Sequence, residues 1–136
     1  MKPLIKICGI AEKDNLIQLT KIEKIDFLGF IFYERSLRNA TIDFVNSISH
    51  VDFKNKRPVC VYVNADKEFI EETSSYFVNP ILQFHGDETN TFCQSFKKDF
   101  WKVIIVKDAD SIKLVTDYPD ASGILFENYE TGIYGG

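Results

Sequence analysis

The segment "ILQFHG" (residues 81–86) carries a glutamine and a histidine inside an otherwise apolar, strand-like run. Side chains of a strand point alternately to its two faces, so Gln83 and His85 share one face of the predicted strand. An open doubly wound sheet, covered by helices on both faces, would house Gln83 poorly, whereas the interior of a β/α barrel accepts polar side chains near its catalytic end. The segment therefore favours a barrel over a doubly wound sheet.

Similar apolar runs recur along the chain and alternate with helix-like stretches. Five further strands are predicted at residues 4–9, 27–33, 58–64, 101–106 and 122–128. Helices are predicted at residues 14–22, 41–49, 66–77 and 89–100, with a fifth that ends before Pro119. Strands joined through helices run parallel with right-handed crossovers. We therefore expect one α/β domain over residues 1–136, a TIM-type β/α barrel left incomplete because units seven and eight are missing.

Composition and charge exclude several classes of protein. The chain has 136 residues, a formal net charge of −4 and 26% charged residues. Its lysines and arginines form no basic stripe, so no nucleic-acid partner is expected. No apolar run approaches the roughly 20 residues of a membrane span, and the apolar start is too short for a signal peptide, so we expect no membrane association and a cytoplasmic location. The oligomeric state stays open.

The chain has three cysteines, Cys8, Cys60 and Cys93, and they are widely spaced. An odd number without a CxxC pair argues against a disulfide framework and against a zinc site, so no metal is expected. Cys60 lies inside an apolar run and Cys93 on the predicted core face of a helix, which is typical of buried hydrophobes. Local pattern alone would give Cys8 the same role. Its position at a strand end, on the same face as Lys6, instead favours a reactive thiol.

Other polar residues also follow predicted strands, at the end where β/α barrels keep their chemistry. His85 and Glu127 end two of the strands, and a carboxylate after "GILF" is costly to bury unless it is paired or functional. Arg38, in "ERSLR" (34–38), can clamp a carboxylate or phosphate, although the same segment would suit a solvated loop. Asp87 and Glu88 are interpreted as residues that favour the dipole of the following helix.

Five motifs in order resemble the phosphoribosylanthranilate isomerase family, β/α-barrel enzymes of tryptophan biosynthesis. They are "KICGI" (6–10), "LGFIFYERSLR" (28–38), "VYVN" (61–64), "QFHGDE" (83–88) and "ILFENYETGIYGG" (124–136). The resemblance implies an aldose–ketose isomerase that needs no metal or organic cofactor. Its reaction is the Amadori rearrangement of N-(5-phosphoribosyl)anthranilate, a small anionic phosphosugar, to 1-(2-carboxyphenylamino)-1-deoxyribulose 5-phosphate.

The resemblance also implies roles for individual residues. Cys8 matches the family's general base, and Glu127 stands where the family has its general acid, an aspartate. Arg38 matches an arginine that helps to hold the anthranilate carboxylate, while Gln83 and His85 match residues that line the pocket. A thiol accepts a proton only as thiolate, and we expect Lys6, on the same strand face, to supply the positive charge that favours that form.

The sequence departs from the family pattern in three ways. Glu127 is one methylene longer than aspartate, Leu37 replaces a proline, and the sequence stops at Gly136 after the sixth predicted strand. Phosphate sites of β/α barrels usually come from the loops after strands seven and eight, so we expect a truncated sequence that is inactive or very weak by itself. Two alternatives stay open: a catalytically inactive fragment or degenerate homologue, and another phosphate-binding β/α-barrel lyase that forms a Schiff base on Lys6.

Overall fold

A computed structural model describes residues 2–129 and contains one sheet of six parallel strands. The strands follow one another in chain order, and each pairs in parallel with its sequence neighbours. They are β1 (Lys6–Ile7), β2 (Phe27–Phe32), β3 (Arg57–Tyr62), β4 (Ile81–Phe84), β5 (Phe100–Val106) and β6 (Gly123–Asn128). The predicted β/α architecture is therefore confirmed.

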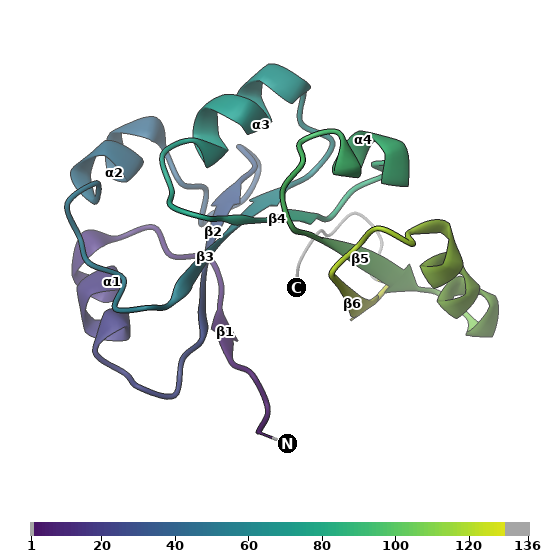
Figure 1. The fold of residues 1–136 in the computed structure, drawn as a ribbon, viewed down its shortest axis with the longest axis horizontal. Coiled ribbons are helices and arrows are strands. Elements are labelled where there is room, and N and C mark those ends of the chain that lie inside the picture. Colours follow the sequence, from purple (N-terminus) through teal and green to yellow (C-terminus); the bar gives the residue numbers. More distant parts are fainter. Residues whose placement is uncertain (1, 130–136) are drawn as a thin grey trace.

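The connections between strands are helical and lie along the outer side of the curved sheet (Figure 1). They are α1 (Lys13–Thr20), α2 (Ile42–Ser47), α3 (Lys67–Ser74), α4 (Asn90–Gln94) and the 3-10 helix η1 (Ala109–Asp117). Four of them follow an N-cap residue whose side chain accepts a hydrogen bond from the backbone N–H three residues on, namely Thr41, Asp66, Thr89 and Asp108. This cap satisfies a backbone N–H that has no partner within the helix.

The structure corrects two predicted helices. The helix predicted at residues 89–100 ends at Gln94 as α4, because Lys97 takes a left-handed backbone conformation with φ +54° and Phe100 already belongs to β5. Phe100 is buried and pairs with Leu82, so its apolar side chain contributes to the sheet rather than to a helix face. The fifth helix ends before Pro119 as predicted, but it is a 3-10 helix.

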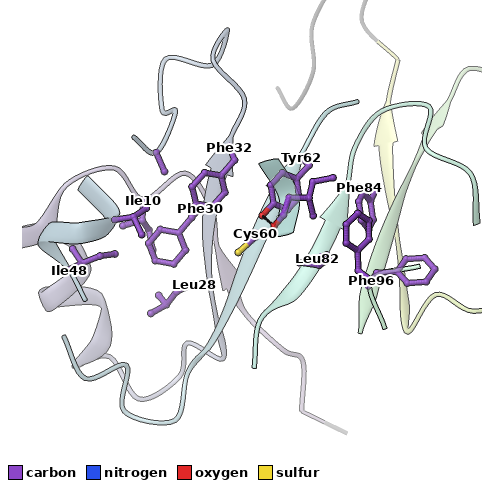
Figure 2. Packing of buried hydrophobic residues seen from close by; sticks show 14 of the residues in the cluster. Ile10, Leu28, Phe30, Phe32, Ile48, Cys60, Tyr62, Leu82, Phe84 and Phe96 are labelled. Carbon is purple, nitrogen blue, oxygen red and sulfur yellow. Dashed lines mark hydrogen bonds between the residues drawn. The ribbon is translucent and has the colours of Figure 1, made fainter. Parts of the chain in front are cut away.

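The main core lies between the outer face of the sheet and the helices. Alternate strand residues point outward, and several of them, such as Phe30, Tyr62 and Phe84, are labelled in Figure 2. The helices contribute the buried side chains of Leu16, Val45, Ile70 and Cys93 to the same cluster. The buried members from the strands are Leu28, Phe30, Phe32, Cys60, Tyr62, Leu82, Phe84 and Phe100. Burying each large side chain stabilises the fold by roughly 1.5–3 kcal/mol relative to exposure.

The inner face of the sheet carries a second, smaller cluster. It contains Val59, Val61 and Ile81, with Cys8, Phe27, Ile31 and Trp101 packed against it. The Lys6 ammonium on β1 donates to the Gln83 side-chain oxygen on β4 at 2.6 Å, although β2 and β3 lie between these strands. A contact of that kind requires strong curvature, so the inner face forms the interior of a partial barrel. Within residues 2–129, no helix has both the length and the apolarity that a membrane crossing requires.

Candidate active site

The five residues singled out in the sequence line one cavity at the carboxyl ends of the strands. The cavity has a volume of about 250 Å³, and its walls include Cys8, Arg38, Gln83, His85 and Glu127. These residues come from β4 and β6 and from the segments that follow β1, β2 and β4. In a flat sheet β1 and β6 would lie far apart, since they stand at the two ends of the strand order. The curvature of the sheet brings their side chains onto one cavity.

At the β1 end of the cavity, Arg38 folds back over the backbone of the "CG" pair. Its Nη1 donates a hydrogen bond to the Cys8 carbonyl oxygen at 3.1 Å. Gly9 has φ +82°, and a Cβ on Gly9 would lie 2.5 Å from Arg38 Nη1. A side chain at Gly9 would be strained by this φ and would displace Arg38. Gly9 therefore lets the guanidinium lie beside Cys8.

The side chains of Lys6 and Cys8 lie together over Gly29 of β2. A Cβ on Gly29 would be 3.0 Å from Cys8 Sγ and 3.0 Å from Lys6 Cε, so the glycine leaves the space that both occupy. Cys8 is half-buried, and Lys6 is bound to Gln83 as described above. The predicted common face of Lys6 and Cys8 thus exists, with an ammonium on the same side of the sheet as the thiol.

At the other end of the cavity, His85 and Glu127 form a close pair. His85 Nε2 lies 2.5 Å from Glu127 Oε2, and the two side chains are 10% and 27% exposed. His85 follows β4 and Glu127 lies on β6, so the contact passes across β5 on the inner face. An imidazole and a carboxylate in hydrogen-bond contact can hold and exchange a proton. The Glu127 carboxylate is therefore held against an imidazole on the cavity wall.

Two further charged residues, Glu88 and Lys102, are buried next to the segment that follows His85, although they do not line the cavity. Glu88 is 6% exposed and lies outside α4, which begins at Asn90, so its interpretation as a helix-dipole residue is wrong. Its carboxylate contacts Lys102, which is 2% exposed on the outer face of β5. A lysine inside the run "WKVIIV" (101–106) was the sequence signal that pointed to a buried partner.

The remaining cysteines behave as the predicted buried hydrophobes. Cys60 and Cys93 are both fully buried, and the pKa of each thiol rises to about 12, chiefly because burial disfavours the thiolate. Burial also raises the pKa of Tyr62, and the neighbouring Cys60 adds to that rise. A thiol that stays protonated at neutral pH is a poor nucleophile and a poor base. Cys8 is the cysteine that reaches the cavity.

Residues 2–129 contain no group of three or more His, Cys, Asp or Glu side chains arranged to hold a metal ion. The motif at 124–136 lies partly outside the described residues, which end at Tyr129, and its glycines all belong to the part outside them. The cavity that the structure describes includes a thiol, an ammonium, a guanidinium, an imidazole, a carboxylate, an amide and two hydroxyls among its lining groups.

Comparison with known proteins gives a consistent result over nearly the whole chain. The family model of N-(5'phosphoribosyl)anthranilate (PRA) isomerase matches residues 5–133. The N-(5'-phosphoribosyl)anthranilate isomerase of Nitrosomonas europaea is 35% identical over 137 residues, covering 100% of this chain and 64% of the relative. The protein of the same name from Marinomonas is 33% identical and covers 97% of this chain and 64% of the relative. The chain thus spans about 64% of the length of these curated relatives.

Solved structures show the same similarity in three dimensions. The phosphoribosyl anthranilate isomerase of Thermotoga maritima superposes with a TM-score of 0.83 at 26% identity, covering 99% of this chain and 66% of that protein. A second structure, a phosphoribosyl anthranilate isomerase in complex with reduced 1-(o-carboxyphenylamino)-1-deoxyribulose 5-phosphate, superposes with a TM-score of 0.80 at 26% identity. It covers 95% of this chain and 66% of that protein. The six-stranded sheet therefore has the arrangement found in these barrel proteins.

Proposed function

The chain belongs to the N-(5'-phosphoribosyl)anthranilate isomerase family, and we propose that its cavity catalyses the Amadori rearrangement of N-(5-phosphoribosyl)anthranilate in tryptophan biosynthesis. The observation that carries this proposal is the convergence of Cys8, Arg38, Gln83, His85 and Glu127 on one cavity at the carboxyl ends of the strands. β/α-barrel enzymes hold their catalytic residues at this end. The free cysteines are compatible with the cytoplasmic location expected from the sequence.

The reaction needs one acid and one base on different sides of the sugar. An acid protonates the furanose ring oxygen, the ring opens to a Schiff base, and a base removes the proton from C2′. The resulting enolamine takes up a proton at C1′ and becomes the ketone. The substrate supplies both the carbon that is oxidised and the carbon that is reduced, so no external redox partner takes part. Each proton-transfer group can contribute roughly 10²–10⁴-fold.

Glu127 is the proposed acid and Cys8 the proposed base. Glu127 lies on β6 and contacts His85, while Cys8 follows β1, at opposite ends of the strand order but on one cavity. A sugar bound between them would meet the two groups from different sides. His85 holds the longer glutamate side chain in place, which supports the acid role despite the departure from the family aspartate.

Arg38 and Gln83 are the proposed binding residues. Arg38 is exposed at the mouth of the cavity and presents a planar guanidinium, which suits the carboxylate of the anthranilate. Gln83 is buried and accepts from the Lys6 ammonium. A Schiff-base lyase would need the Lys6 nitrogen free to attack a carbonyl, whereas Lys6 Nζ is held by Gln83 at 2.6 Å.

The phosphate of the substrate requires a further binding element. β/α barrels commonly bind phosphate with loops after strands seven and eight, and residues 2–129 form six strands. The curated relatives are longer than this chain, which spans about 64% of them. We propose that a phosphate site outside residues 2–129 completes the active protein.

A chimaera tests whether the site is competent independently of that phosphate site. Residues 1–129 are joined to the part of the Nitrosomonas europaea relative that follows its matched region, and the product is assayed for rescue of a tryptophan auxotroph. We expect rescue by the chimaera and a loss of roughly 10²–10⁴-fold in kcat for Cys8→Ser and for Glu127→Gln. A folded chimaera without turnover, or full rescue by both variants, would refute the assignment.

A further inference from the structure

The Glu88 carboxylate accepts hydrogen bonds from two loops and one strand, next to the acid end of the cavity. Its Oε1 accepts from the Gly86 backbone N–H at 2.8 Å and from Lys102 Nζ at 3.3 Å, and its Oε2 accepts from the Asn64 N–H at 2.9 Å. Asn64 follows β3, Gly86 follows β4 and Lys102 lies on β5. The side chains of Glu88 and Lys102 are only 2% and 3% exposed.

Lys102 holds the same loop from its other side. Its Nζ donates to the Gly86 carbonyl oxygen at 2.5 Å, so both the N–H and the C=O of Gly86 are bound by the ion pair. The Tyr118 hydroxyl donates to the Glu88 carbonyl oxygen at 2.7 Å, and the Lys102 ammonium lies 5.3 Å from the centre of the Tyr118 ring. A buried ion pair offsets its desolvation cost only when such additional bonds are made.

Asn64 also contacts the segment at Gly86 and Asp87 through its side chain. Asn64 Oδ1 accepts from the Asp87 N–H at 2.8 Å, and a Cβ on Gly86 would lie 2.5 Å from that same oxygen. The loop that follows His85 is therefore held by three side chains, those of Glu88, Lys102 and Asn64. His85 donates its backbone N–H to the Tyr62 carbonyl oxygen at 2.9 Å, so its backbone is held by β3 before the imidazole and by the bonds of Gly86 after it.

We propose that the Glu88–Lys102 ion pair is a positioning device for the acid end of the cavity. By fixing both polar groups of Gly86, the pair sets the direction of the adjacent His85 imidazole, and that imidazole sets the Glu127 carboxylate. Glu88 and Lys102 do not line the cavity, so they act through His85 and not on substrate. The catalytic consequence rests on the proposed function, whereas the geometric consequence does not.

The test observes His85 in the intact 136-residue chain. The chain has two histidines, and His50 is exposed, so its imidazole serves as an internal reference. We expect Glu88→Gln and Lys102→Met each to change the ¹⁵N signal of His85 Nε2, which reports its hydrogen bond, and to leave the His50 signal in place. Glutamine keeps the size of Glu88 but has one acceptor oxygen for its three donors, so at least one N–H is released.

Two controls separate positioning from a general loss of stability. Leu16→Ala removes a fully buried side chain from α1 and should lower the melting temperature, while the His85 signal stays unchanged below the melting transition. Tyr118→Phe deletes only the hydroxyl bond to Glu88 and should change the His85 signal less than Glu88→Gln does. If Glu88→Gln and Lys102→Met do not fold, the His85 signal of Tyr118→Phe provides the test of the proposal.

Turnover provides a second readout in the chimaera. Misplacement of the acid should lower kcat by about 10- to 100-fold in Glu88→Gln and leave KM within about twofold, because substrate binding does not involve this pair. An unchanged His85 signal in folded Glu88→Gln, or in Tyr118→Phe where the former does not fold, would overturn the proposal. Absence of turnover in every chimaera, with the His85 change present, would instead refute the proposed function and support the positioning role.

Discussion

The contact between Gly9 and Arg38 allows a prediction whose size follows from the structure. Gly9→Ala places a methyl group at φ +82°, which costs roughly 1–2 kcal/mol for a residue other than glycine. The same methyl would lie 2.5 Å from Arg38 Nη1 and 2.7 Å from Cζ, so the guanidinium has to leave. Its hydrogen bond to the Cys8 carbonyl oxygen is then lost, at about 1 kcal/mol. We expect Gly9→Ala to lower the free energy of unfolding by about 2–3 kcal/mol.

A double-mutant cycle with Arg38→Ala isolates the steric part. Arg38→Ala alone should cost about 1 kcal/mol, because it removes the same hydrogen bond. That bond can be lost only once, so the double variant should be about 1 kcal/mol less destabilised than the sum of the single variants. Urea unfolding of the four proteins measures this directly. Additive effects, within roughly 0.5 kcal/mol, would show that Arg38 does not rest on Gly9 and would refute the description of this end of the cavity.

Three further predictions concern the thiols and the acid. In the folded chain at pH 8, iodoacetamide should label Cys8 alone, because thiols with a pKa of about 12, such as Cys60 and Cys93, are only roughly 10⁻⁴ ionised at that pH. Mass spectrometry should find one label on the native chain and three after denaturation. Labelling of Cys60 in the native chain would contradict its burial. The raised pKa values of Cys60 and Cys93 favour the native state below pH 9.0, the ordinary value for a thiol of the unfolded chain. The free energy of unfolding should therefore fall as the pH rises from 9.0 towards 12, with up to about 1.4 kcal/mol per pH unit from each thiol. A flat urea midpoint over that range would argue against both assignments. Glu127→Asp shortens the side chain by roughly 1.5 Å and so moves the carboxylate out of hydrogen-bond reach of His85, from which it now lies 2.5 Å away. We expect kcat of the chimaera to fall about 10²-fold, although aspartate is the residue of the family. An unchanged kcat would show that the contact with His85 does not position the proposed acid.

Local sequence pattern was sufficient for the order of the elements. Alternation in "ILQFHG" (81–86) put Gln83 on the inner face and Leu82 on the outer one, and the predicted helix starts at residues 66 and 89 coincide with the caps Asp66 and Thr89. Each of these signals acts over one or two turns of chain, so it can be read without knowing the fold. Phe100 shows the limit, because helical spacing and strand pairing compete there and the partner Leu82 decides the outcome.

The site was predictable to the extent that strand ends meet at one edge of a parallel sheet. That rule places Cys8, His85 and Glu127 at the same edge, and the cavity is lined by all three. The contact partners were not predictable, since they depend on curvature and side-chain direction. Neither the Lys6–Gln83 bond nor the burial of Glu88 against Lys102 follows from spacing, because each joins elements that are distant in the sequence.

The most direct test of the central claim follows the proton at C2′ of the substrate. The chimaera is supplied with N-(5-phosphoribosyl)anthranilate labelled with ¹³C at C2′ in deuterated water, and the products are examined by NMR. If Cys8 and Glu127 act as base and acid, the labelled carbon becomes a ketone and deuterium enters at C1′, and both changes disappear in Cys8→Ser. Conversion at an undiminished rate in Cys8→Ser, or no conversion by the folded chimaera, would contradict the account.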